Sequence, residues 1–101
     1  MGNPIIDFPF SFANVDADTI VKTGAGVLHT VTLNGVTTVG DIVIYDGVDA
    51  TGTVIATINA RTAVSVSFQG ITFTYDCKVS TGIFVDIASS TFAGNITVTY
   101  Y

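Results

Sequence analysis

Short runs of alternating or continuously apolar residues, separated by glycine-containing turns, repeat along most of the chain. In one such run Phe73 and Tyr75 alternate with Thr74, which is the period-two pattern of a half-buried β-strand. No stretch longer than a turn shows the 3.6-residue apolar period of a helix. The pattern predicts eight strands, over residues 19–23, 27–34, 41–45, 53–59, 64–68, 71–79, 83–88 and 95–101.

Composition supports an all-β chain. The 101 residues include 14 Val, 11 Ile and 16 Thr, but only two Leu and no Glu. β-Branched side chains are stiff at χ1 and pack well on a pleated surface, whereas Leu and Glu favour helices. Short strands at this spacing are typical of an antiparallel sandwich or barrel.

The first 17 residues differ from the rest, since both prolines of the chain lie there and turn glycines are lacking. Proline favours extended backbone in the residue before it, and extended backbone puts Phe8, Phe10 and Phe12 on one side. We therefore divide the chain into an extended arm or first strand, residues 1–17, and a sandwich domain, residues 18–101. The three rings either pack on their own domain or dock on a neighbouring subunit.

Two features of the strands predict assembly with sister chains. The run around Ile42 and Ile44 is apolar on both faces, and a partner subunit is the simplest cover for its outer side. Monomeric β-proteins usually guard strand edges with Lys or Pro, yet this chain has two Lys and two Pro. We expect a closed homo-oligomer, a trimer or higher ring, with contacts through Phe8, Phe10, Phe12, Ile42 and Ile44.

The sequence offers few groups for catalysis or metal binding. His29 is the only histidine and Cys77 the only cysteine, which is short of the usual four ligands of a zinc site. No serine stands in a G-x-S-x-G motif. A calcium site formed by Asp46, Asp49 and nearby Asp41 is an alternative to a structural turn, but the regular spacing with a closing Glu is lacking. We expect no enzyme activity, no cofactor and no metal.

The remaining polar residues receive structural interpretations. Strict alternation puts His29 on the apolar face that carries Val31, as a histidine hydrogen-bonded in a core or interface. Asp76 and Asp86 are expected in a solvated stripe with Lys78, and Cys77 is expected to behave as a small buried hydrophobe.

Charge excludes some partners and leaves one rival class. The net charge of −5 disfavours binding to nucleic acid or to an anionic membrane surface, and the apolar runs are too short to span a bilayer. A small glycan-binding sandwich is the rival to a structural subunit. Such modules usually present exposed rings for stacking, and this chain has no Trp. The plausible rings are Tyr45, Phe84, Phe92 and Tyr101.

Three stretches carry a resemblance to known proteins. They are K-T-G-A-G-V-L-H-T-V-T-L-N at residues 22–34, D-I-V-I-Y-D-G-V-D-A-T-G-T-V-I-A-T-I at 41–58 and F-T-Y-D-C-K-V-S-T-G-I-F-V-D-I-A at 73–88, followed by the closing N-I-T-V-T-Y-Y. Together they resemble small structural proteins of tailed bacteriophages and marine viral metagenomes. The resemblance implies a jelly-roll-like β-sandwich on the virion surface, serving as a capsid decoration, head-fibre or tail-associated subunit. It also implies trimers and contacts with other virion proteins.

Overall fold

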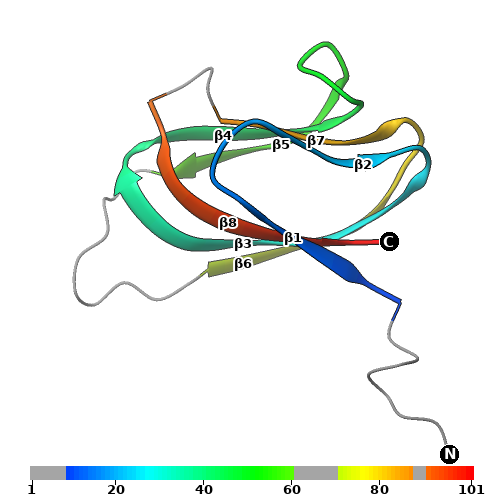
Figure 1. Cartoon of the computed structure of the whole chain (residues 1–101), viewed down its shortest axis with the longest axis horizontal. Coiled ribbons are helices and arrows are strands. Elements are labelled where there is room, and N and C mark those ends of the chain that lie inside the picture. The colour runs from blue at the N-terminus through cyan, green and yellow to red at the C-terminus, as the bar shows by residue number, and fades with distance from the viewer. Residues whose placement is uncertain (1–8, 61–70, 88–90) are drawn as a thin grey trace, which may run out of the picture.

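The computed structural model describes residues 9–60, 71–87 and 91–101 and shows two four-stranded antiparallel sheets packed face to face (Figure 1). Sheet A contains, in spatial order, β1 (Ser11–Val15), β8 (Ala93–Tyr100), β3 (Gly26–Thr38) and β6 (Ile71–Val79). Sheet B contains β2 (Thr19–Thr23), β7 (Gly82–Asp86), β4 (Gly40–Asp46) and β5 (Thr53–Ala60). The prediction of an all-β sandwich with about eight strands is confirmed. Within these ranges there is no helix that could cross a membrane.

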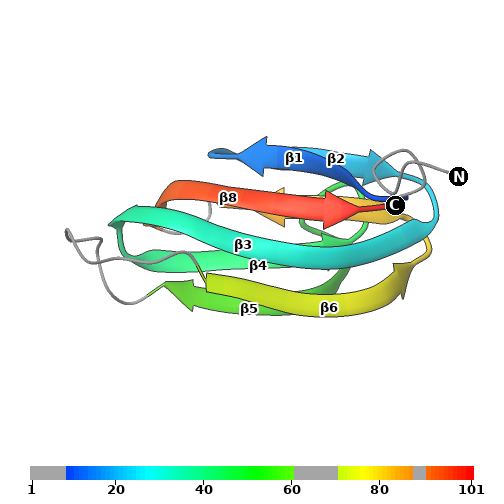
Figure 2. The ribbon, with the colours of Figure 1, turned by 90° about the horizontal axis from the view of Figure 1, so that it is seen from below.

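The strands pair in a nested order. β1 pairs with β8, β2 with β7, β3 with β6 and β4 with β5, all antiparallel. The chain is thus one long ribbon that doubles back between β4 and β5, wrapped so that successive pairs lie in opposite sheets. The ladders of β3 with β8 and of β4 with β7 complete the two sheets. This wrapping is a jelly roll, and it places β1 beside β2 on one side of the sandwich and β5 beside β6 on the other (Figure 2).

The strand boundaries agree with the alternation in most places. β2 and β6 have the predicted bounds, whereas β3 is longer than the predicted strand over residues 27–34. β1 falls inside the N-terminal segment 1–17, so residues 11–15 form the first strand of the sandwich rather than a free arm. The predicted strand over residues 64–68 lies outside the described residues.

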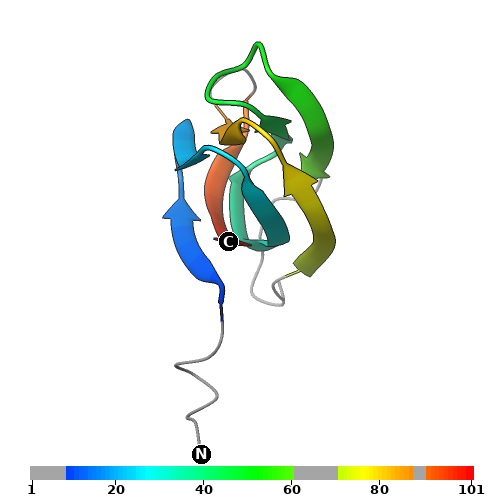
Figure 3. The same cartoon turned by 90° about the vertical axis from the view of Figure 1, so that its right-hand side faces the viewer.

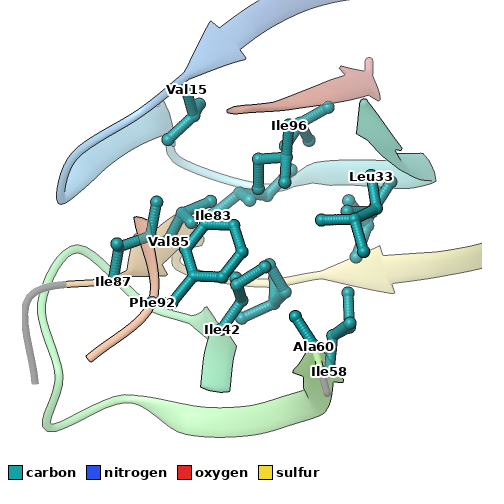
Figure 4. Close-up of a cluster of buried hydrophobic side chains, with 14 of the residues drawn as sticks. Val15, Leu33, Ile42, Ile58, Ala60, Ile83, Val85, Ile87, Phe92 and Ile96 are labelled. Atoms are coloured by element: carbon teal, nitrogen blue, oxygen red, sulfur yellow. The ribbon is translucent and has the colours of Figure 1, made fainter. Parts of the chain in front are cut away.

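The core lies between the two sheets and is built from one face of each inner strand (Figure 4). Sheet A contributes Leu28, Val31, Ile96 and Val98, and sheet B contributes Ile42, Ile44, Ile83 and Val85, all 0 % exposed. Burying one such side chain contributes about 1.5–3 kcal/mol. Every buried side-chain polar atom in the described part of the chain has a hydrogen-bond partner. Cys77, the single cysteine of the sequence, is free, so packing rather than a disulfide stabilises the fold.

Candidate functional site

Ile42 and Ile44 lie in the core of their own chain, which corrects their assignment as contact residues. Both side chains are 0 % exposed. β4 is a central strand between β5 and β7, and its alternate residues face the core. The outward side chains are those of Asp41, Val43 and Tyr45, and a sister chain can reach this strand only through them.

The phenylalanines of the N-terminal segment do not share one environment. The Phe10 ring stacks on the imidazole of His29, with centroids 4.0 Å apart and an interplanar angle of 10°. Phe12, on β1, is 74 % exposed. Phe8 lies outside the described residues. One ring therefore packs on its own domain, and a contact between Phe12 and another subunit remains a prediction.

A row of apolar side chains crosses the outer face of sheet B. Ile20 on β2 lies opposite Phe84 on β7. Tyr45 on β4 lies between Phe84 and Val54, which is on β5. Ile20 and Val54 are 51 % and 52 % exposed, and the rings of Tyr45 and Phe84 lie 6.2 Å apart. We call these four residues the apolar band. At about 4.8 Å between strands it extends roughly 14 Å.

The strand at one end of the apolar band is an unguarded sheet edge. β5 pairs only with β4 among the described strands and contains no charged residue. β6, the edge of sheet A, lies beside it on the same side of the sandwich (Figure 3). Unpaired backbone groups on a long, uncharged edge are a template for pairing with another chain. Val54 belongs to both features, so the band and the edge form one continuous surface.

His29 and Asp76 pair on the outer face of sheet A. Against β8, the register shifts between Leu28 and Thr30 because His29 is an extra residue of β3. Against β6, the extra residue is in β6, where Tyr75 and Asp76 lie opposite His29. Nδ1 of His29 is hydrogen-bonded to the carboxylate of Asp76. The shift turns Leu28 inward and His29 outward, with 27 % of the imidazole exposed. The placement of His29 on the face of Val31 is therefore wrong, because strict alternation fails at a bulge.

Asp46, at the end of β4, binds the crossover from β6 to β7. Its carboxylate accepts hydrogen bonds from the backbone N–H groups of Ser80, Thr81 and Gly82, at 3.0, 2.9 and 3.3 Å. The hydroxyl of Ser80 donates another. These donors, the N–H of Thr81 first, favour the ionised form and hold the pKa of Asp46 below its ordinary value. The carboxylate thus fixes the turn that links the two sheets.

Asp49 and Asp41 also have local structural partners. The hydroxyl and the N–H of Thr51 donate to Asp49 and lower its pKa, and the Asn59 amide donates to Asp41 at 2.7 Å. The prediction of a structural turn around Asp46 and Asp49 is confirmed. Within the described ranges no three acidic, His or Cys side chains gather in a way that could hold a metal ion.

The environments of three further strand residues, Asp86, Cys77 and Tyr75, correct or refine what the sequence predicts for them. Asp86 is only 4 % exposed, so its assignment to a solvated stripe is wrong, because β7 is a central strand between β2 and β4. Cys77 is half-buried against the core. Partial burial, with a smaller effect of the Cys77 thiol, raises the pKa of the Tyr75 phenol. Neither of two depressions on the described surface, one beside Asp16 and one beside Lys22, is lined by any of these groups.

The aromatic residues suggested for sugar stacking are scattered over the fold. Phe92 is buried in the core at 5 % exposure, and Tyr45 and Phe84 belong to the apolar band. Tyr101 is 61 % exposed, and its backbone pairs with Val27. The most exposed ring among the described residues is instead that of Phe12, for which the sequence predicts either packing on its own domain or docking on another subunit.

Sequence reasoning did not find the apolar band, because Ile20 and Val54 are far apart in the chain and only the strand register brings them into one row. An alternation pattern predicts which face of a sheet a residue occupies, but not which residues of the neighbouring strands lie beside it.

No family model, no curated protein and no solved structure matches the chain.

Proposed function

We propose that this chain is a non-enzymatic structural subunit that assembles with copies of itself. The apolar band on the outer face of sheet B carries this proposal. It offers apolar surface on all four strands of that sheet, and its end residues, Ile20 and Val54, are about half exposed in the single chain. Covering such a surface removes apolar area from water, which favours association.

The contact must extend beyond the band. A stable subunit interface buries about 800 Å² on each partner. The band measures only roughly 14 Å by 7 Å, the width being one repeat of a strand. The adjoining edge of β5 adds eight residues, Thr53–Ala60, or about 26 Å of strand. We therefore place the contact on the band together with the β5 edge, and the partner is a second copy of the chain.

The resemblance to tailed-phage structural proteins supports a place on a virion. In that setting the chain acts by surface complementarity, as a capsid decoration, head-fibre or tail-associated subunit that also contacts other virion proteins. A contact between two different surface patches generates a ring when the rotation closes, and a trimer is the expected ring. The net charge of −5 supports a partner other than nucleic acid.

Light scattering coupled to size-exclusion chromatography tests this assembly. The chain is expected to elute at three times its mass of 10.5 kDa, and Ile20→Asp and Val54→Asp are expected to elute as monomers. Both positions are about half exposed, so these variants should keep the fold. Thr74→Asp, at an exposed position on sheet A, is the matched control and should leave the mass unchanged.

Two outcomes contradict the proposal in different ways. A monodisperse wild-type monomer at micromolar concentration removes self-assembly altogether. An oligomer that survives both band variants but dissociates in Phe12→Asp moves the contact to the N-terminal segment. A single substitution is preferable there to deletion of residues 1–17, because that deletion would remove β1 from sheet A.

A further inference from the structure

The outer face of sheet A is a surface of hydroxyl and amide groups, unlike the apolar band on sheet B. Three adjacent strands each present two threonines two residues apart. These are Thr97 and Thr99 on β8, Thr30 and Thr32 on β3, and Thr72 and Thr74 on β6. The residues between them, such as Val98 and Val31, are 0 % exposed and face the core. All six threonines therefore lie on the outer face.

The strand register aligns these threonines into two rows. Thr30 lies opposite both Thr99 and Thr74. Thr32 lies opposite Thr97 and Thr72, and its hydroxyl lies 2.9 Å from that of Thr72. A threonine hydroxyl can donate one hydrogen bond and accept two, so a paired threonine keeps hydrogen-bonding capacity for a ligand.

Three asparagines extend the rows at the end of the sheet. Asn14 and Asn95 bond each other reciprocally, at 2.9 and 2.7 Å. Asn34 donates to the side chains of Asn95 and Thr97, at 2.9 and 2.8 Å. Asn34 acts only as a donor among the described residues, so its amide oxygen can accept a hydrogen bond from a ligand. The asparagine cluster is thus held in place by its own hydrogen bonds.

A depression of about 400 Å³ adjoins the asparagine cluster. It is lined by Asp16, Gly35, Val36, Thr37, Gly94 and Asn95. Its volume falls within the range of small-molecule sites, about 300–1,000 Å³. At Gly35 no atom lies within 4 Å of where a Cβ would be, so this part of the lining faces open space. Asp16 is exposed and supplies the one carboxylate of the lining.

An exposed ring flanks the same surface. Phe12 and Asn14 lie two residues apart on β1 and share its outer face, and Phe12 lies opposite Thr99. Phe12 is 74 % exposed, and its ring stacks on no other ring in the described part of the chain, whereas the ring of Phe10 stacks on His29. A free aromatic face beside hydrogen-bonding groups can take the apolar face of a ring-shaped polar ligand.

We propose that this face binds a neutral oligosaccharide, with a sugar ring on Phe12 and sugar hydroxyls bonded to Asn34, Asn95 and Asp16. Sugar hydroxyls both donate and accept, and so do threonine hydroxyls and asparagine amides. The threonine rows and the asparagine cluster contain no Lys or Arg, and the chain has a net charge of −5, which disfavours an acidic polysaccharide. This proposal is independent of self-assembly, because it uses the opposite sheet.

Affinity electrophoresis of the full chain tests the proposal. The gels contain one neutral polysaccharide each, a β-glucan, a mannan, a xylan or an amylopectin, with polygalacturonate as the acidic comparison. We expect retardation in at least one neutral gel, and at least ten-fold weaker retardation for Phe12→Ala and Asp16→Asn. Both positions are exposed, so both variants should fold, which circular dichroism checks. Val48→Ala, at an exposed apolar position in the turn after β4, outside both the apolar band and sheet A, is the matched control and should migrate like the wild type.

Three results would overturn the proposal. They are migration unchanged in all four neutral gels, retardation in polygalacturonate alone, and retardation that both Phe12→Ala and Asp16→Asn retain. Light scattering distinguishes a failure of the sugar-binding proposal from a failure of the assembly proposal. Ile20→Ala is expected to weaken only the subunit contact, whereas Asp16→Asn is expected to weaken only sugar binding.

Discussion

Asp46 accepts a 2.9 Å hydrogen bond from the backbone N–H of Thr81, and this bond joins the end of β4 to the crossover between the two sheets. Ser80 and Gly82 donate to the same carboxylate. Three successive N–H groups around one anion form the kind of concave site that backbone amides offer to a bound phosphate. Here a side chain of the protein itself occupies that site.

Replacement of Asp46 by Asn is expected to lower the free energy of unfolding at neutral pH. Because the pKa of Asp46 is lowered in the folded state, its contribution is complete above the unfolded pKa of about 3.9 and is lost as the pH falls through the folded value. Urea unfolding should therefore show a clear difference between wild type and variant at about pH 7, and a smaller one at about pH 2.5. Asp16→Asn removes the same charge from an exposed position and serves as the control. An equal difference at both pH values would contradict this role of Asp46.

Gly82 is expected to resist substitution for a steric reason. A Cβ there would lie 2.5 Å from the carbonyl oxygen of Lys22 and 2.9 Å from that of Gly47, and backbone atoms cannot move aside cheaply. Gly82→Ala should lower the free energy of unfolding by about 1–3 kcal/mol. Gly35→Ala, where no atom lies within 4 Å, should stay within about 0.5 kcal/mol of wild type. Thermal and urea unfolding measure both, and similar losses in the two variants would contradict the steric account.

The alternation of apolar and polar residues was enough to predict the all-β class and most strands. β6 has the predicted bounds because Phe73 and Tyr75 face the core while Thr72 and Thr74 are exposed along an edge strand. Alternation fails where the ladder is irregular. Against β8, His29 is an extra residue in β3, and nothing in its sequence neighbourhood marks the register shift that turns it outward.

The candidate surfaces could not be predicted because each depends on pairing between distant segments. Ile42 and Ile44 belong to a run that is apolar on both faces, and the sequence does not say which face a second sheet covers. The structure shows that they form the core, and that the outward Tyr45 joins Phe84 in the apolar band. Likewise, the threonines of three strands form rows only once the register of β3, β6 and β8 is known.

Ile44 and Ile20 are expected to respond differently to truncation. Ile44→Ala removes a side chain that is 0 % exposed and should cost about 2–5 kcal/mol at any protein concentration. Ile20, at 51 % exposure, contributes little to the single chain, so Ile20→Ala should lower the melting temperature only at concentrations where the oligomer is populated. Differential scanning calorimetry over a hundred-fold range of concentration measures this. A concentration-independent effect at Ile20 would place that side chain in the core of the chain rather than in a subunit contact.

The hydrogen-bonded pair of His29 and Asp76 is expected to contribute little to the free energy of unfolding. The backbone conformation of Asp76 is expected to contribute more. Their side chains are 27 % and 56 % exposed, and exposed pairs of this kind contribute less than about 1 kcal/mol. A double-mutant cycle should therefore give a coupling energy of that size.

Asp76 has a φ of 47°, in the left-handed region that Gly adopts freely and that costs other residues about 1–2 kcal/mol. In a His29→Ala background, Asp76→Gly should therefore be more stable than Asp76→Ala by about 1 kcal/mol, as measured by urea unfolding. Equal stability of these two double variants would mean that the bulge relaxes when the pair is removed, and that the hydrogen bond itself imposes the left-handed conformation.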